Sequence, residues 1–166
     1  VSGSDANELE FADLNNDSFK DAITVNSGNG TMSVMLGNGS ELGSASSFGV
    51  GTNPESVVIA DFDNDGDEDL AVSVVGSSSG EREIQVIRND TETTLILIAD
   101  QIAGSGTNPE MVEHGDFNSD GLLDIVSIIE LDSVNGTSPG IGIFMNITAV
   151  VNDCEGDIDG NGMTDI

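Results

Sequence analysis

Basic residues are almost absent from this chain of 166 residues. Three lysines and arginines stand against 31 aspartates and glutamates, which gives a formal net charge of −28. Lys20, Arg82 and Arg88 cannot form a basic patch, so nucleic acid and anionic membranes are not expected as partners, whereas cationic partners are compatible. A chain of this charge repels itself, and divalent cations bound where carboxylates crowd would offset part of that repulsion.

Histidine and cysteine each occur once, which limits the available chemistry. His114 and Cys154 have no second base nearby, so neither a Ser-His-Asp nor a Cys-His nucleophile system can be assembled. A carboxylate pair for glycoside hydrolysis stays open, but most clustered aspartates belong to the loops described below. We therefore expect no enzymatic activity. Cys154 cannot form an internal disulfide, and we interpret it as a buried thiol, with a free thiol or a bond to another chain as alternatives.

Long hydrophobic runs are also missing. No stretch of about 18 apolar residues exists, so we expect no membrane insertion. The apolar runs are short and β-branched, as in residues 57–60 and 70–75, and Gly, Ser and Asp bound them. Hydrophobic residues make up 37% of the chain, patterned too regularly for disorder. The pattern predicts an all-β protein.

Three acidic stretches carry an oxygen side chain at positions 1, 3, 5 and 9: the first loop (residues 13–21), the second loop (61–69) and the third loop (116–124). Calcium prefers six to eight oxygen ligands, and a tight loop with alternate inward residues and one backbone carbonyl supplies them. Position 12 is Thr, Val or Ser rather than the Glu of an EF-hand. The flanking runs are strand-like, so the spacing predicts calcium loops between strands.

A second motif repeats in register with these loops. Gly-Thr-Asn-Pro-Glu occurs at 51–55 and at 106–110, each time with its glycine ten residues before the loop. The loops are offset by 48 residues (13 to 61) and 55 residues (61 to 116), as in propeller blades. We predict four short strands a unit and a β-propeller-like array of about three four-stranded blades in an incomplete ring. The expected limits are 1–48, 49–103 and 104–147 for the blades, and 148–166 for a linker and the start of a further calcium loop.

The stretch from Ala60 to Ala71, Ala-Asp-Phe-Asp-Asn-Asp-Gly-Asp-Glu-Asp-Leu-Ala, resembles the FG-GAP or VCBS repeat of integrin-α-type β-propellers. The resemblance covers roughly residues 3–146 and implies Ca²⁺ at the edge of each blade. In the first loop Ser18 replaces the glycine and Lys20 lies inside it, so we expect the weakest binding there. The implied ligands, with the carbonyl oxygen at position 7, are Asp61, Asp63, Asp65, Asp67 and Asp69; Asp116, Asn118, Asp120, Leu122 and Asp124; and Asp13, Asn15, Asp17, Phe19 and Asp21.

A fourth stretch with this spacing closes the chain, at residues 157–165, without a Gly-Thr-Asn-Pro turn before it. It resembles either the start of another repeat or the first calcium loop of a dockerin, whose position 12 would be residue 168. Its expected ligands are Asp157, Asp159, Asn161, the carbonyl of Met163, and Asp165.

Six Asn-x-Ser/Thr sequons raise the number of candidate glycosylation sites: Asn16, Asn29, Asn38, Asn89, Asn135 and Asn146. Three of them are followed by glycine, which is typical of hairpin turns. A sequon marks a glycan only in a secreted chain, so turns and glycans both remain open.

These features predict an extracellular, secreted or cell-surface, calcium-binding repeat protein with a structural or adhesive role. Millimolar calcium outside cells suits weak modules of this kind. Exposed blade edges would favour self-association or pairing with other repeat chains, into a fibre or a larger propeller. The alternative is a non-catalytic glycan-binding or docking module of a secreted polysaccharide-acting enzyme, in which a glycan or a cell-surface ligand is the partner.

Overall fold

The computed structural model describes residues 5–75, 82–89, 97–101, 109–129 and 140–144. These residues form eleven strands: β1 (Ala6–Ala12), β2 (Asp21–Asn26), β3 (Thr31–Met35), β4 (Ser46–Gly49), β5 (Pro54–Ala60), β6 (Asp69–Val75), β7 (Arg82–Asn89), β8 (Leu97–Gln101), β9 (Pro109–Gly115), β10 (Asp124–Ile129) and β11 (Gly140–Phe144). Within the described part of the chain, no helix is long and apolar enough to cross a membrane.

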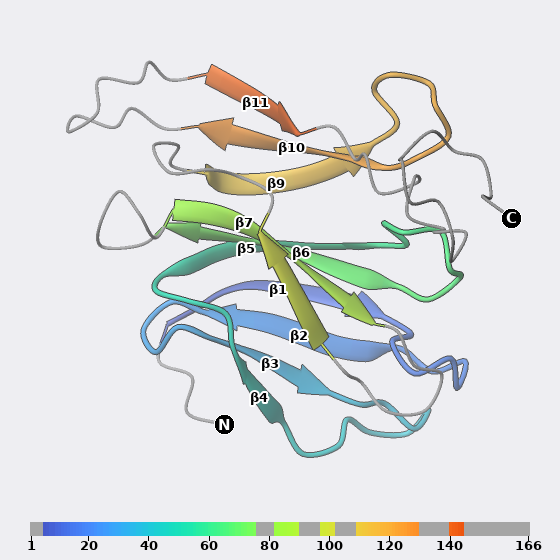
Figure 1. Ribbon diagram of the computed structural model, residues 1–166. Helices are drawn as coiled ribbons and strands as arrows, with labels where there is room; N and C mark the ends of the chain where they lie inside the picture. The colour runs from blue at the N-terminus through green and yellow to red at the C-terminus, as the bar shows by residue number, and fades with distance from the viewer. Residues whose placement is uncertain (1–4, 76–81, 90–96, 102–108, 130–139, 145–166) are drawn as a thin grey trace, which may run out of the picture.

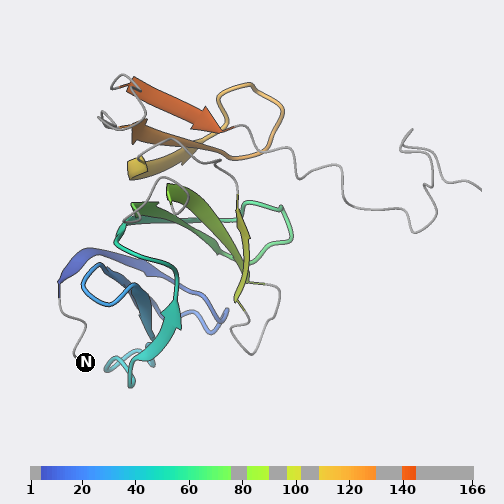
Figure 2. The same cartoon turned by 60° about the vertical axis from the view of Figure 1, so that its left-hand side comes forward.

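The strands form three antiparallel sheets, in the orders β1-β2-β3-β4, β5-β6-β7-β8 and β9-β10-β11. Figure 1 shows them stacked, with the β1–β4 sheet at the bottom and the β9–β11 sheet at the top. The second view keeps this layering (Figure 2). In each sheet the first two strands flank an acidic loop, as predicted. The all-β, propeller-like fold without a closed ring is thus confirmed, while the predicted blade limits remain predictions and residues 148–166 lie outside the described part.

The core consists of two apolar layers, one on each face of the middle sheet. Val57, Val72 and Val74 pack with the first sheet, whereas Ala71 and Ile84 pack with the third. Because both faces of β6 are covered, the strand is a continuous apolar run instead of an alternating one. The second loop is therefore attached to the most enclosed strand of the molecule.

The repeated turn motif connects one sheet to the next. Gly51 has φ +106° and Asn53 has φ +52°, conformations that glycine and asparagine adopt more easily than other residues. The Asn53 carbonyl accepts a hydrogen bond from the Val75 N–H at 3.0 Å, and Pro54 begins β5. The first copy of this motif is thus a structural turn.

Candidate metal centre

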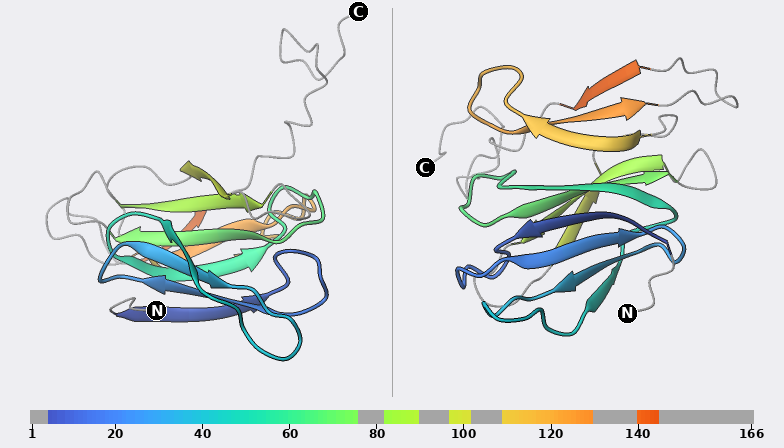
Figure 3. Two further views of the ribbon diagram at one scale, coloured as in Figure 1. Left: turned by 90° about the horizontal axis from the view of Figure 1, so that it is seen from below. Right: turned by 180° about the vertical axis from the view of Figure 1, so that it is seen from behind.

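The three loops lie at the same end of the stack of sheets, each between the first and second strand of its sheet (Figures 1 and 3). Short β-strands enter and leave each loop, and the antiparallel pairing places the last residue before the loop opposite position 9. Ala12 pairs with Asp21, Ala60 with Asp69 and Gly115 with Asp124. The base of each loop is therefore closed by the sheet itself.

The second loop is held by hydrogen bonds from its own backbone to its own carboxylates. The two oxygens of Asp61 accept the N–H groups of Asp65 at 3.1 Å and Gly66 at 3.0 Å. Asp65 in turn accepts the N–H of Asp67 at 2.9 Å. These bonds bend the chain into a tight turn with the carboxylates gathered on its inside.

The first and third loops repeat this pattern at the same positions. The position 1 carboxylate, Asp13 or Asp116, accepts the N–H groups of positions 5 and 6, at 3.0 and 2.7 Å in the first loop and at 3.1 Å for both in the third. The position 5 carboxylate accepts the N–H of position 7, at 2.9 Å in both. The three acidic stretches are thus three copies of one local structure.

Asp61, Asp63 and Asp65 bring one carboxylate oxygen each to within 4.8 Å of one another. Among the described His, Cys, Asp and Glu residues they form the single group of three with this property. Hard oxygen donors at this spacing fit a hard divalent cation such as Ca²⁺. Positions 1, 3 and 5 of the second loop, predicted as ligands from the spacing, therefore come together.

The loops differ in charge at position 3. Asn15 and Asn118 stand where the second loop has Asp63, and each donates its side-chain N–H to the position 5 carboxylate, at 3.1 and 2.9 Å. An amide oxygen is a neutral ligand, so the first and third loops offer one negative charge fewer than the second. Fewer charged ligands mean lower affinity for calcium.

The aspartate at position 9 braces the base of the loop. Asp69 is fully buried, and its two oxygens accept the N–H groups of Phe62 at 3.0 Å and Asn89 at 2.8 Å. Asp21 and Asp124 are equally buried and accept the equivalent N–H of position 2, from Leu14 at 2.9 Å and Phe117 at 3.0 Å. The ligand role expected for position 9 stays a prediction, and the bracing role was missed because burial of an aspartate cannot be read from spacing.

Burial raises the pKa of the Asp69 carboxyl to about 6, and the nearby charges of Asp63 and Asp65 add to the rise, although the two N–H donors oppose it. Without a cation, the protonated carboxyl favours the fold. This contribution is complete below the ordinary pKa of 3.8 and is lost as the pH rises through about 6. A divalent cation in the loop would supply the missing positive charge at neutral pH.

Asn89 connects the first two loops. Its side chain is 1% exposed, and its amide nitrogen donates to the Leu14 carbonyl of the first loop at 2.7 Å and to the Glu68 carbonyl of the second at 3.3 Å. At the surface, Asn16 donates to Asp67 at 2.6 Å. The two loops are thus neighbours across the boundary between sheets.

The burial of Asn89 corrects one glycosylation prediction. A glycan on its amide nitrogen has no room in the folded chain, because that nitrogen is enclosed and already bonded to two carbonyls. Asn16, Asn29 and Asn38 are exposed and remain candidates. The sequons at Asn135 and Asn146 lie outside the described residues, as do all five expected ligands of the fourth loop, Asp157, Asp159, Asn161, Met163 and Asp165.

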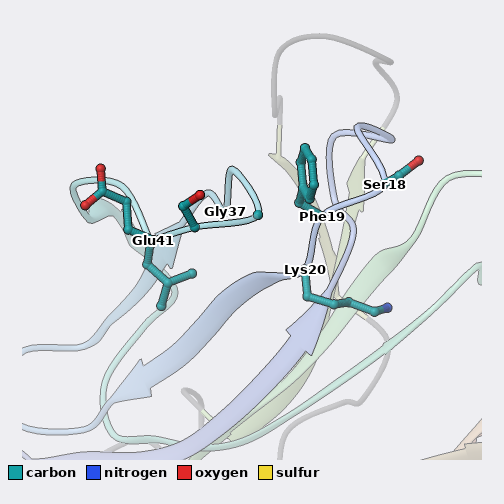
Figure 4. A pocket seen from close by; sticks show the side chains of 8 residues that line it. Ser18, Phe19, Lys20, Gly37 and Glu41 are labelled. Carbon is teal, nitrogen blue, oxygen red and sulfur yellow. The ribbon is translucent and has the colours of Figure 1, made fainter.

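A shallow pocket of about 310 Å³ opens beside the first loop (Figure 4). Phe19 and Lys20 line it on the loop side, and residues 37–42 line it on the other, except Asn38. The ring of Phe19 lies so close to Gly39 that no side chain would fit there. The position 7 residue, expected to contribute only its carbonyl, therefore also packs the loop against the neighbouring hairpin.

Among curated proteins, no match to this chain was found. Residues 13–72 match the model of the FG-GAP-like repeat family. The match begins at the first residue of the first loop, contains the whole second loop and ends inside β6. This part of the chain is therefore an FG-GAP-like repeat.

Proposed function

We propose that the protein is an extracellular calcium-binding repeat module with a structural or adhesive role and no enzymatic activity. The observation that carries the proposal is the convergence of Asp61, Asp63 and Asp65 in a loop whose hydrogen-bonded frame recurs twice more. FG-GAP repeats often bind calcium and are typically extracellular, which supports the same conclusion. A bound Ca²⁺ would neutralise carboxylates that otherwise repel one another and would hold the ends of two strands together.

The proposed role of calcium is to stabilise the stack of sheets, since each loop joins two strands of one sheet and the first two loops touch across the sheet boundary through Asn16 and Asp67. Ligands that bind only the native state raise its stability. We therefore expect the temperature of unfolding to rise with calcium concentration.

The test is calcium titration by calorimetry together with thermal unfolding in calcium and in chelator. We expect stoichiometric binding and a higher unfolding temperature in calcium. The variant Asp63→Asn should weaken one site while keeping the fold, because asparagine stands naturally at this position in the first and third loops. The variant Glu41→Gln removes one exposed negative charge outside the loops and serves as its matched control. Equal calcium binding by the two variants would contradict the proposal.

Glycan binding is a second candidate function, favoured by one observation. Phe19 is 43% exposed and lines the pocket of Figure 4 together with Ser18, Ser40 and Glu41, and an exposed aromatic ring with polar neighbours suits a sugar face. Phe19→Ala should then abolish binding on a glycan array without changing calcium stoichiometry. Binding that survives the substitution would remove this pocket from consideration.

A further inference from the structure

The middle sheet shows what each face of a sheet in this molecule requires. Its rear face, toward the first sheet, carries Val57 and Val72, and its forward face, toward the third sheet, carries Val58 and Ala71. Each of the two internal contacts therefore joins the forward face of one sheet to the rear face of the next. All four of these side chains are at most 9% exposed.

The third sheet leaves its forward face uncovered among the described residues (Figure 1). Val112 and Ile125 pack against the middle sheet, and because side chains alternate along a strand, Met111 and Ile128 lie on the opposite face. They are 52% and 49% exposed. Ile141 stands directly opposite Ile128 in the pairing of β10 with β11 and is 74% exposed. These three residues are named the forward patch.

The first sheet leaves its rear face uncovered in the same way. Leu9 and Phe11 stand four and two residues before the first loop, as Val57 and Ile59 do before the second. Val57 is fully buried and Ile59 packs against the same core, whereas Leu9 is 52% and Phe11 54% exposed. Leu9 and Phe11 are named the rear patch.

The forward patch is more apolar than the internal surface to which it corresponds. Counted from the loops, Met111 takes the place of Ser56 and Ile128 that of Ser73. In the internal contact Ser73 donates to the Glu110 carbonyl at 2.8 Å and Ser56 accepts the Val112 N–H at 3.2 Å. Large apolar side chains instead of hydroxyls call for a large apolar counterpart, and the rear patch has Leu and Phe where the middle sheet has Val and Ile.

We propose that a second copy of this chain docks its rear patch on the forward patch of the first, head to tail, and so continues the stacking of sheets between molecules. The proposal deepens the structural function proposed above and rests on it. Such a contact is heterologous, so it propagates into a fibre unless rotation closes a ring. It also replaces edge pairing, expected from the sequence, by face-to-face packing. Burying five exposed apolar side chains drives it, and the negative charge of each copy opposes it, so added salt strengthens association.

The experiment measures mass by sedimentation velocity in calcium, at low and high sodium chloride concentration, for the wild-type chain, Phe11→Asp and Ile128→Asp. The wild type should form a series of oligomers that grows with salt, and each variant alone should be monomeric, since every contact needs one intact patch of each kind. An equimolar mixture of the two variants retains one compatible pair of patches, so it should form dimers and nothing larger. Leu42→Asp, an exposed leucine outside both patches, should associate like the wild type.

A monomeric wild type at all concentrations and salts would overturn the stacking proposal, and so would a mixture of the variants that stays monomeric. A variant that associates by itself would contradict the head-to-tail geometry. Calorimetric calcium binding on the same samples separates this outcome from failure of the proposed function, because the patches contain no loop residue. If either variant does not fold, as judged by circular dichroism, Leu9→Asp and Ile141→Asp test the same two patches at exposed positions.

Discussion

The first and second loops have the same hydrogen-bonded frame but different residues at two positions. Position 6 is Ser18 with φ +72° in the first and Gly66 with φ +99° in the second, and position 8 is Lys20 or Glu68. In spite of this, Asp13 and Asp61 accept N–H groups from the same two positions. The position 1 carboxylate therefore shapes the loop, whereas glycine at position 6 reduces the strain and the charge at positions 3 and 8 adjusts the affinity for a cation.

The largest effect is expected from removing the shared carboxylates of one loop. Asp61→Ala with Asp63→Ala should eliminate one calcium equivalent and destabilise the fold by about 2 kcal/mol, because two backbone N–H groups lose their charged acceptor. Calorimetry and urea unfolding measure both. Asp13→Ala with Asn15→Ala is the matched change in the first loop and should cost similar stability but less calcium affinity. Unchanged stoichiometry in the second-loop variant would refute the metal site.

Asn89→Ala should lower the stability of both loops together by about 2 kcal/mol, because the buried carbonyls of Leu14 and Glu68 lose their donor. Hydrogen exchange of the amides in residues 13–21 and 61–69 would then accelerate in both loops. Exchange that changes in the second loop alone would show that the first loop does not depend on this bridge.

Exchanging the residues at position 6 should shift stability by about 1 kcal/mol in opposite directions. Ser18→Gly removes a serine from a left-handed conformation and should stabilise the protein. Gly66→Ala should destabilise it through backbone strain alone, since an added Cβ at Gly66 meets no atom within 4 Å. Thermal unfolding of the two variants tests the pair, and a stabilising Gly66→Ala would show that strain does not distinguish the loops.

The smallest effect is expected from charge at position 8. Lys20→Glu introduces the residue of the second loop and should raise the calcium affinity of the first loop about two- to threefold at low ionic strength, with less gain as salt screens the charge. Lys20→Gln should give about half the gain in free energy. Equal affinity for all three side chains would mean that this loop binds no cation.

Much of the fold and of the site could be predicted from residues close together in the chain. The spacing of Asp61, Asp63 and Asp65 identified carboxylates that do converge, and the strand order within a sheet followed from runs such as 70–75. The bracing role of Asp69 and the bridge made by Asn89 could not be predicted. Each needs partners from another strand or another sheet, and no local pattern marks an aspartate or asparagine as buried.

By itself, the sequence determined the local structure: an aspartate followed four and five residues later by free N–H groups folds into the same turn three times over. The tertiary structure decided which side chains are enclosed. Val57 and Leu9 hold equivalent places in the repeat, yet one is buried and the other is half exposed. The physical reason is that hydrogen bonds within a loop depend on neighbouring residues, whereas burial depends on which sheet lies against which face.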